Sequence, residues 1–363
     1  MLSSKAAGAM FKYTFSFDDV LLVPKYSDIV SRKEVDITGT LGEHRFELPI
    51  ISSPMDTVTE SEMAISMGTH GGLGIVHRDN TVQEQAEIVS SARYGLQDSA
   101  HVGVAVGISG DFLERAAASI SEGADVLCVD VAHGHHAMME RCIKTLKDKF
   151  PEVTMMAGNV AMSDGYLDLS SWGADAVRVG IGGGSICSTR LQTGHGVPTL
   201  QSIFACYIAR SMAISNPDTA PEGFTPASII ADGGIRTSGD IVKSIAAGAD
   251  MVMLGSMLAG TTQAPGEVFV SKDGKKHKAY RGMASRAAQI EWRGRTSSLE
   301  GISTMISYKG DVSAVLTDVK QNTKSGFSYT GARTASELRN KCEFVIQTAA
   351  GQRESSTHIL EKR

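Results

Sequence analysis

Short apolar runs alternate with longer amphipathic stretches along most of the chain. Eight runs of four or five residues are almost continuously apolar, which is typical of strands buried on both faces. They lie at 49–52, 72–76, 102–106, 126–130, 154–157, 176–179, 228–231 and 251–254. Most stretches between them repeat apolar residues at helical spacing, as at 111–122 and 136–149. Repeated strand–helix units predict a parallel sheet, and eight units are the number in a (β/α)8 or TIM barrel. A doubly wound sheet fits the same alternation.

Polar or glycine-rich clusters follow seven of the eight predicted strands. They occupy 53–56, 77–79, 130–135, 158–159, 180–184, 232–234 and 255–256. Each cluster alone is explained by the turn-forming tendency of Gly, Asn and Asp. Seven clusters at the same point of the repeating unit favour a single catalytic rim, because the carboxyl ends of barrel strands build the active site.

The alternation stops after Ala259. An Asp–Gly pair at 273–274 predicts a hairpin within 261–280. Segment 281–307 is rich in Gly, Ser and Arg with weak periodicity, which predicts a loop or flap. Residues 334–341 have a short helical pattern, and 216–226, with three prolines, predicts a surface loop. We therefore expect one catalytic barrel domain over 1–363, with a hairpin and active-site flap at 261–310.

Composition narrows the class of protein. The 363 residues are 42% hydrophobic, enough for the core of a single large barrel. A net charge of -5 gives no broad electrostatic reason to bind nucleic acid. No apolar run approaches the roughly 18 residues that span a membrane, and residues 1–10 lack the apolar segment of a secretion signal. Five scattered cysteines without a CxxC pair indicate neither a zinc site nor a disulfide framework, so we expect a cytoplasmic protein.

The segment 179–190 carries the sharpest chemical signal. Here a strand leads into four glycines within five residues, and Cys187 then stands among hydroxyls and an arginine. Such glycines let backbone groups converge on an ion, and an exposed cysteine of this kind is typical of a nucleophile. Cysteines in apolar surroundings, such as Cys128, are better explained as small buried hydrophobic residues. The clusters at 232–234 and 255–256 follow the last two strands, where barrels often bind phosphate, and Asp232 suits a ribose diol.

Five segments resemble the IMP dehydrogenase/GMP reductase family, and the match extends over nearly the whole chain. They read FDDVLLVP at 17–24, SPMDTV at 53–58, GGGSICSTR at 182–190, ADGGIR at 231–236 and YRGM at 280–283. The resemblance implies a (β/α)8 barrel, usually a homotetramer, that acts on a purine nucleotide (IMP, XMP or GMP) with NAD or NADP.

The resemblance also implies roles for individual residues. Cys187 would attack C2 of the purine, and Thr189 would help to activate water or ammonia. The residues implied in nucleotide binding are Ser53, Met55, Ser185, Asp232, Gly234, Gly255, Ser256 and Met283. Those implied on the nicotinamide side are Asp130, Asn159 and Gly180. A potassium ion would be held by Gly182, Gly184 and Cys187 together with Glu354, Ser355 and Ser356 of a neighbouring subunit.

The motifs point to opposite directions of the reaction. The chain lacks the CBS regulatory insert of most dehydrogenases, and its 193–198 segment and short flap resemble the reductase. YRGM, 130–135 and 351–355 resemble the dehydrogenase.

Neither catalytic partner set is intact. Of the dehydrogenase Arg–Tyr pair, only the arginine has candidates, Arg293 or Arg295. The reductase glutamate is replaced by Arg286 unless Glu291 or Glu300 substitutes.

The balance of these motifs favours NAD-dependent oxidation of IMP to XMP through a Cys187 adduct. NADPH-dependent conversion of GMP to IMP is the alternative. A non-catalytic purine nucleotide sensor and a flavin-dependent barrel enzyme are further alternatives.

Overall fold

Eight parallel strands form a closed barrel in the computed structural model, which describes residues 13–97, 99–355 and 357. The strands are β4 (Ile50–Ser52), β5 (Leu73–Val76), β6 (Val102–Val106), β7 (Val126–Asp130), β8 (Thr154–Val160), β9 (Ala176–Val179), β10 (Ser228–Asp232) and β11 (Met251–Leu254). β11 pairs with β4 through Val252–Ile50 and neighbouring residues, and this pairing closes the ring. The predicted barrel is therefore confirmed, and the doubly wound sheet is excluded.

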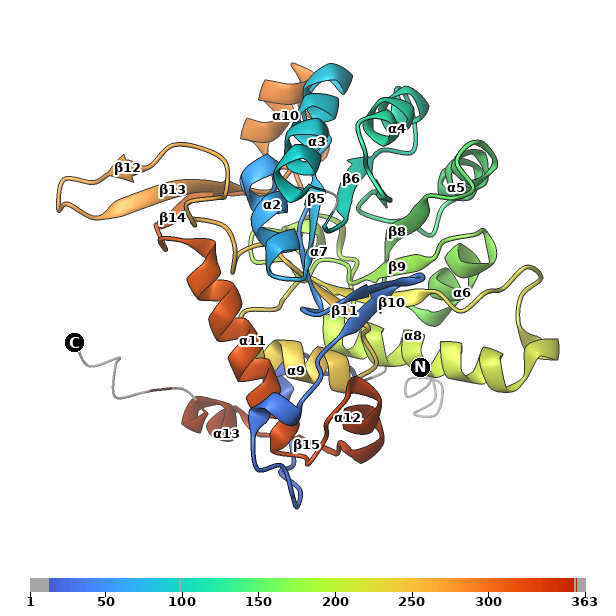
Figure 1. Ribbon diagram of the computed structural model, residues 1–363, viewed down its shortest axis with the longest axis vertical. Coiled ribbons are helices and arrows are strands. Elements are labelled where there is room, and N and C mark those ends of the chain that lie inside the picture. The colour runs from blue at the N-terminus through green and yellow to red at the C-terminus, as the bar shows by residue number, and fades with distance from the viewer. Residues whose placement is uncertain (1–12, 98, 356, 358–363) are drawn as a thin grey trace, which may run out of the picture.

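Helices cover the outside of the barrel (Figure 1). The ring consists of α2 (Ser61–Thr69), α3 (Val82–Leu96), α4 (Phe112–Ser121), α5 (Ala137–Lys149), α6 (Ser163–Ser171), α8 (Thr199–Ser215), α9 (Ser238–Ala246) and α11 (Val312–Ser328). α3 shows why these segments become helices. Its N-cap Thr81 accepts a hydrogen bond from the Glu84 amide, and the Glu84 carboxylate accepts one from the Thr81 amide. Val89 and Leu96, two turns apart, are then buried toward the strands.

The core has two layers separated by the strands. Outward-facing strand residues such as Leu127 and Val177 pack with the helices, while Ile51, Ile75 and Cys128 fill the barrel interior. The hairpin of β2 (Gly39–Leu41) and β3 (His44–Phe46) adds Leu41 and Phe46 to the interior cluster. It closes the amino-terminal end of the barrel, so the carboxyl end is left for the site.

A three-stranded antiparallel sheet projects from the barrel (Figure 1). It consists of β12 (Phe269–Val270), β13 (Lys276–Arg281) and β14 (Ser303–Ser307). The hairpin predicted at Asp273–Gly274 is confirmed as the β12–β13 connection. The irregular flap predicted over 281–307 is wrong in part, because it contains α10 (Arg286–Arg293) and β14. Ser285 caps α10 by accepting a hydrogen bond from Ala288 N, and Gly294 ends the helix at φ +65°.

The remaining elements surround this frame. They are η1 (Phe17–Asp19), β1 (Val20–Leu22), η2 (Arg32–Glu34), α7 (Thr189–Thr193), η3 (Pro217–Thr219), α12 (Ala335–Lys341), β15 (Phe344–Ile346) and α13 (Ala349–Glu354). The helix predicted at 334–341 is thus confirmed.

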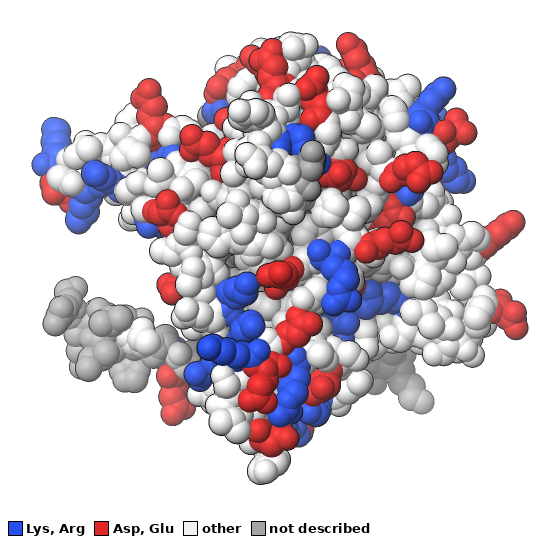
Figure 2. Space-filling view, viewed as in Figure 1, with Lys and Arg blue, Asp and Glu red and all other residues white. Residues whose placement is uncertain are grey.

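Two further observations concern the charged side chains and the length of the helices. Acidic and basic side chains are interspersed over the face in Figure 2. In the described part of the chain, no helix combines the length and apolarity required to cross a membrane.

Candidate active site

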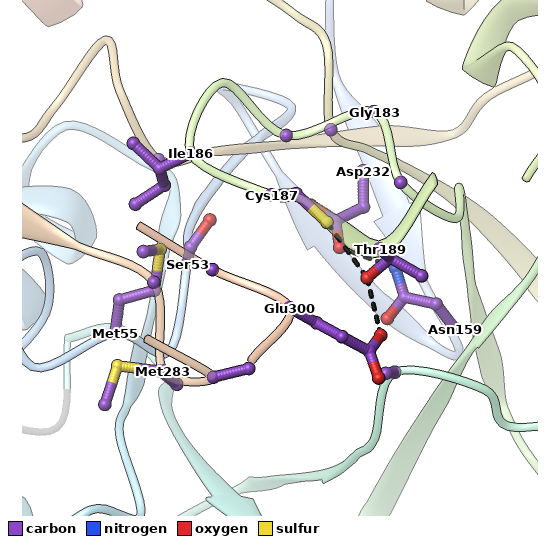
Figure 3. Close-up of a pocket in the computed structure, with 18 of the residues that line it drawn as sticks. Ser53, Met55, Asn159, Gly183, Ile186, Cys187, Thr189, Asp232, Met283 and Glu300 are labelled. Carbon is purple, nitrogen blue, oxygen red and sulfur yellow. Dashed lines mark hydrogen bonds between the residues drawn. The ribbon is translucent and has the colours of Figure 1, made fainter. Parts of the chain in front are cut away.

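A cavity of about 440 Å³ opens at the carboxyl end of the barrel, between the strand-end loops and the flap. Figure 3 shows Cys187, Thr189 and Glu300 joined by hydrogen bonds on one side of this pocket, with Met55 and Met283 on the other side. All the residues assigned above to nucleotide binding or to the nicotinamide side line it, as do Gly182, Gly184, Cys187 and Thr189. The structure thus gathers into one pocket residues that the sequence spreads over more than 200 positions.

The glycine loop brings Cys187 to the pocket. Gly180 has φ +144°, and a Cβ there would lie 1.9 Å from the carbonyl oxygen of Asp232. Only glycine lets the end of β9 pass so close to β10. The chain then turns through Gly182, at φ +76°, and Cys187 is reached just before α7. Cys187 is partly exposed, in contrast to Cys128, Cys142 and Cys206, which are buried.

A chain of hydrogen bonds connects Cys187 to a carboxylate of the flap. The thiol Sγ donates to Thr189 Oγ1 at 3.3 Å, and that hydroxyl donates to Glu300 Oε2 at 2.8 Å (Figure 3). The Ser188 amide donates to the Glu300 carbonyl at 2.8 Å, which ties the flap to the cysteine loop. The arrangement offers a route for a proton between the sulfur and a carboxylate.

One end of the pocket suits a phosphate. Gly233 and Gly234 have φ +88° and +80°, and they lie beside the Gly183–Gly184 backbone. Ser185, Gly255 and Ser256 line the same cavity. Backbone N–H groups and hydroxyls of this kind are the donors that proteins use for phosphate.

Sequence reasoning missed Tyr280 at this end. It is buried, and its hydroxyl would lie 3.1 Å from a Cβ at Gly255. Burial raises the pKa of Tyr280, so its hydroxyl remains a donor. Tyr280 could have been found from the sequence, because it is the first residue of the YRGM motif.

A buried ion network underlies the floor of the pocket. Arg178, on β9, donates to the carboxylates of Asp130 and Asp232, the latter at 2.8 Å. Burial opposes its charge, but the two carboxylates raise the pKa of Arg178 above its ordinary value. Asn159 Nδ2 donates to Asp232 Oδ2 at 2.7 Å and to Gly180 O at 2.8 Å. Arg178 was not predicted, although a charged residue inside an apolar run was a usable signal.

The flap is attached to the barrel rim by Asp56. Oδ2 of this buried carboxylate accepts hydrogen bonds from Arg281 Nε at 2.8 Å and from Trp292 Nε1 at 2.9 Å. Arg281 also donates to Glu291, whose side chain is 51% exposed. Glu291 therefore faces Arg281, and of the two candidate glutamates Glu300 is the one that reaches Thr189.

Some predicted residues lie away from the pocket. Arg295 is exposed and does not line the cavity, and the side chain of Arg293 lies outside the described residues. Glu354 is the last residue of α13, which packs against η1, and Ser355 follows it. Ser356 lies outside the described residues. Their assignment to a neighbouring subunit's potassium site stays a prediction. No group of three or more potential metal-ligating side chains occurs among the residues described.

Known proteins resemble this chain in both sequence and fold. Residues 14–358 match the family model described as IMP dehydrogenase / GMP reductase domain. An inosine-5'-monophosphate dehydrogenase of Nitrosopumilus maritimus is 34% identical, over 96% of this chain and 98% of that protein. A GMP reductase of Leishmania major is 31% identical, over 96% and 97%. The crystal structure of a Trypanosoma brucei GMP reductase in complex with guanosine 5'-monophosphate has a TM-score of 0.87 at 30% identity, over 97% of this chain and 99% of that one.

Proposed function

Because the chain belongs to the IMP dehydrogenase/GMP reductase family, and is thus an NAD(P)-dependent oxidoreductase, we propose that it is a GMP reductase that converts GMP to IMP. The observation that carries this proposal is the Cys187–Thr189–Glu300 hydrogen-bond chain. The motifs alone favour oxidation of IMP. Glu300 shifts the proposal to the opposite reaction, because it supplies the Thr–Glu pair that the sequence does not reveal at position 286.

The proposed binding mode follows the two ends of the pocket. The phosphate lies against Ser185, Gly234, Gly255 and Ser256, and Asp232 accepts hydrogen bonds from the ribose diol. The purine then extends between Met55 and Met283 toward Cys187, which sets C2 beside the sulfur. The Trypanosoma reductase, which binds guanosine 5'-monophosphate, supports this substrate.

In the proposed reaction the thiol of Cys187 adds to C2 of GMP. Its proton passes through Thr189 Oγ1 to Glu300, and the same path returns it to the departing 2-amino group. The C2–S bond forms, the C2–N bond breaks, and ammonia leaves with the former thiol proton. A reduced nicotinamide held beside Asp130, Asn159 and Gly180 would supply the hydride that enters C2. Cys187 then leaves as a thiolate, takes a proton from solvent, and IMP is released.

The nicotinamide side of the pocket fits such a cofactor. The cavity continues past Cys187 to Asp130, Asn159 and Gly180. Arg78 also lines it, and its buried Nε has no hydrogen-bond partner among the described residues. An unpaired donor beside the Asp130 carboxylate is suited to a polar group of a ligand. NADPH is the form that reduction requires in this proposal, and no step of it uses potassium.

Oxidation of IMP to XMP with NAD is the second candidate. The relatives named as dehydrogenases favour it. It needs the same Cys187 adduct, from which water must then be activated, and no described flap arginine lines the pocket for that task. An assembled proton path beside Cys187 argues against a non-catalytic sensor.

The proposal includes a homotetramer and a cytoplasmic location. Exposed Phe204, Ile208 and Met212, one turn apart on α8, support contacts between copies.

Absorbance at 340 nm tests the proposed reaction directly. We expect GMP to consume NADPH, and we expect Cys187→Ala to abolish this turnover. Steady formation of XMP from IMP and NAD without GMP reduction would refute the proposal. Absence of turnover in both assays would favour the non-catalytic nucleotide sensor.

A second assay isolates the role of Glu300. Glu300→Gln is expected to lower kcat for GMP by about 100- to 1,000-fold, because it removes the general acid–base group. The stoichiometric burst of NADPH from IMP and NADP should persist, since hydride transfer does not use the relay. Glu291→Gln, on the same flap, is the matched control and should stay within about twofold. Loss of the burst together with deamination would contradict the assigned role.

A further inference from the structure

Gln289 on α10 is a buried amide whose hydrogen bonds all go to the flap itself. Its side chain is 2% exposed. Nε2 donates to Ala284 O at 3.0 Å and to Ser298 O at 2.8 Å, and Oε1 accepts from Ser297 N at 2.6 Å and Ser297 Oγ at 3.2 Å. A primary amide has two donors and two acceptor sites, so Gln289 is fully satisfied. Such complete pairing shows that the amide fixes the loop rather than merely filling space.

The loop that it fixes leads directly to Glu300. Residues 296–300 lie between α10 and β14 without regular secondary structure. In the part of the chain that is described, Gln289 is the hydrogen-bond partner of the Ser297 and Ser298 backbone: Ser297 N donates to its Oε1, and Ser298 O accepts from its Nε2. Ser298 Oγ then donates to Glu300 Oε1 at 3.1 Å. The contacts therefore run without a break from Gln289 through Ser298 to Glu300, and on to Thr189.

The cap of α10 does not need this amide. Ser285 already accepts a hydrogen bond from the Ala288 amide at the start of the helix. A buried side chain that served packing alone would be apolar, because burying an amide costs free energy unless its partners are all in place. The amide is thus explained by the loop that it holds.

We propose that Gln289 is the positioning residue that sets the Glu300 carboxylate against Thr189. The proposal rests on the proposed function only in taking Glu300 as the acid–base group. Without Gln289 the 297–298 part of the loop loses its attachment to α10. What remains is the contact of residues 299–302 with Ser188 and Ile186 of the cysteine loop, together with the hydrogen bonds of the Glu300 carboxylate itself. The flap helix and the proton relay thereby act as one unit.

Gln289→Met tests this, because methionine conserves length and removes every hydrogen bond. We expect kcat for GMP and NADPH to fall about 30- to 100-fold, as small displacements of catalytic groups do. KM for GMP and the NADPH burst from IMP and NADP should change less than about threefold, because neither uses Glu300. Ile290→Gln is the matched control. Ile290 is the next residue on α10 and is 52% exposed, and its variant should retain wild-type kcat.

A double-mutant cycle separates positioning from general damage to the flap. Once Glu300→Gln is in place, adding Gln289→Met should lower kcat no further, within about twofold. Additive losses, or a Gln289→Met variant with unchanged kcat, would overturn the proposal. If the enzyme oxidises IMP instead, the proposed function fails, and the same cycle measured on XMP formation still decides the role of Gln289.

Limited proteolysis gives a readout independent of turnover. Arg295 is exposed within the loop beside Gln289. Gln289→Met should speed tryptic cleavage after Arg295 several-fold relative to Ile290→Gln. Equal cleavage rates would show that Gln289 does not hold the loop.

Discussion

Asp56 attaches the flap to the barrel, and replacing Asp56 by asparagine is expected to release the flap. The carboxylate is 3% exposed, and Oδ2 accepts from two nitrogens of Arg281 and from Trp292 Nε1. Asparagine can keep an oxygen at that position but loses the charge. Its amide nitrogen would replace Oδ1, which is buried without a hydrogen-bond partner among the described residues.

The magnitude follows from these contacts. A hydrogen bond to a charged group contributes about 1.5–3 kcal/mol and one to a neutral group about 0.5–1.5 kcal/mol. Replacing the charged acceptor by a neutral one therefore weakens the three hydrogen bonds by about 2–3 kcal/mol in total, because they share one acceptor oxygen and their losses do not add fully. That corresponds to about a 30- to 150-fold shift from the attached to the released flap. The exposed partner of the same arginine, Glu291, should contribute only about 0–1 kcal/mol.

Trp292 reports the outcome. The chain has two tryptophans, so Trp172→Phe leaves Trp292 as the only tryptophan, and excitation that tyrosine does not absorb then reports on it alone. In that background Asp56→Asn should shift the emission to longer wavelength and increase quenching by acrylamide, because the indole loses its buried acceptor. GMP turnover should fall with it, since Glu300 is carried by the same flap. If Asp56→Asn and Glu291→Gln changed quenching and turnover equally, the argument from burial would be wrong.

Two further predictions concern the barrel. Burial raises the pKa of Cys128, Cys142 and Cys206 to about 12, so at pH 8 only about one in ten thousand of these thiols is a thiolate. Burial also raises the pKa of Cys342, the other cysteine that is only partly buried. Iodoacetamide should therefore label Cys187 much faster than the other four cysteines, and Cys187→Ala should remove that fast label; equally fast reaction at a second cysteine would contradict this. Arg178→Met should lower the free energy of unfolding by about 3–5 kcal/mol in urea titrations, because it removes the guanidinium that pairs with both Asp130 and Asp232 and leaves them only the more distant Arg78 and the neutral Asn159 amide. A loss below about 1 kcal/mol would refute the assigned role of Arg178.

The barrel strands could be predicted because burial on both faces leaves a continuous apolar run. β6, β7, β9 and β11 have the predicted bounds. β8 extends three residues beyond its predicted end, because Gly158 and Asn159, which resemble a turn, continue the strand. Closure could not be predicted, since it depends on pairing between β11 and β4, which are about 200 residues apart. The β2–β3 hairpin was missed because its three-residue strands are too short to show a period.

The flap was harder to predict because its order comes from outside itself. α10 has eight residues, too few for a strong helical period, and isolated helices of that length are marginal in water. β14 exists because it pairs with β13, and its side chains are mostly exposed. The fixed points are Asp56 on the barrel rim and Gln289 within the flap, and neither contact has a local sequence signature.

The sequence could place the proposed nucleophile but not its proposed proton partner, because only the first stands in a local pattern. Cys187 and Thr189 are two residues apart on a glycine loop with a strong pattern, whereas Glu300 is 111 residues beyond Thr189. Because Arg286 stands where the reductase glutamate is expected, Glu291 and Glu300 are equivalent candidates along the chain, and only the path of the flap separates them. α10 directs Glu291 toward Arg281, and the loop after it returns to the cysteine, so that Glu300 reaches Thr189. In the proposed mechanism an adduct at Cys187 precedes either outcome, so the choice between ammonia and water would depend on this returning loop. A variant that repositions Glu300 while leaving the barrel intact should therefore change the fate of the adduct without changing its formation.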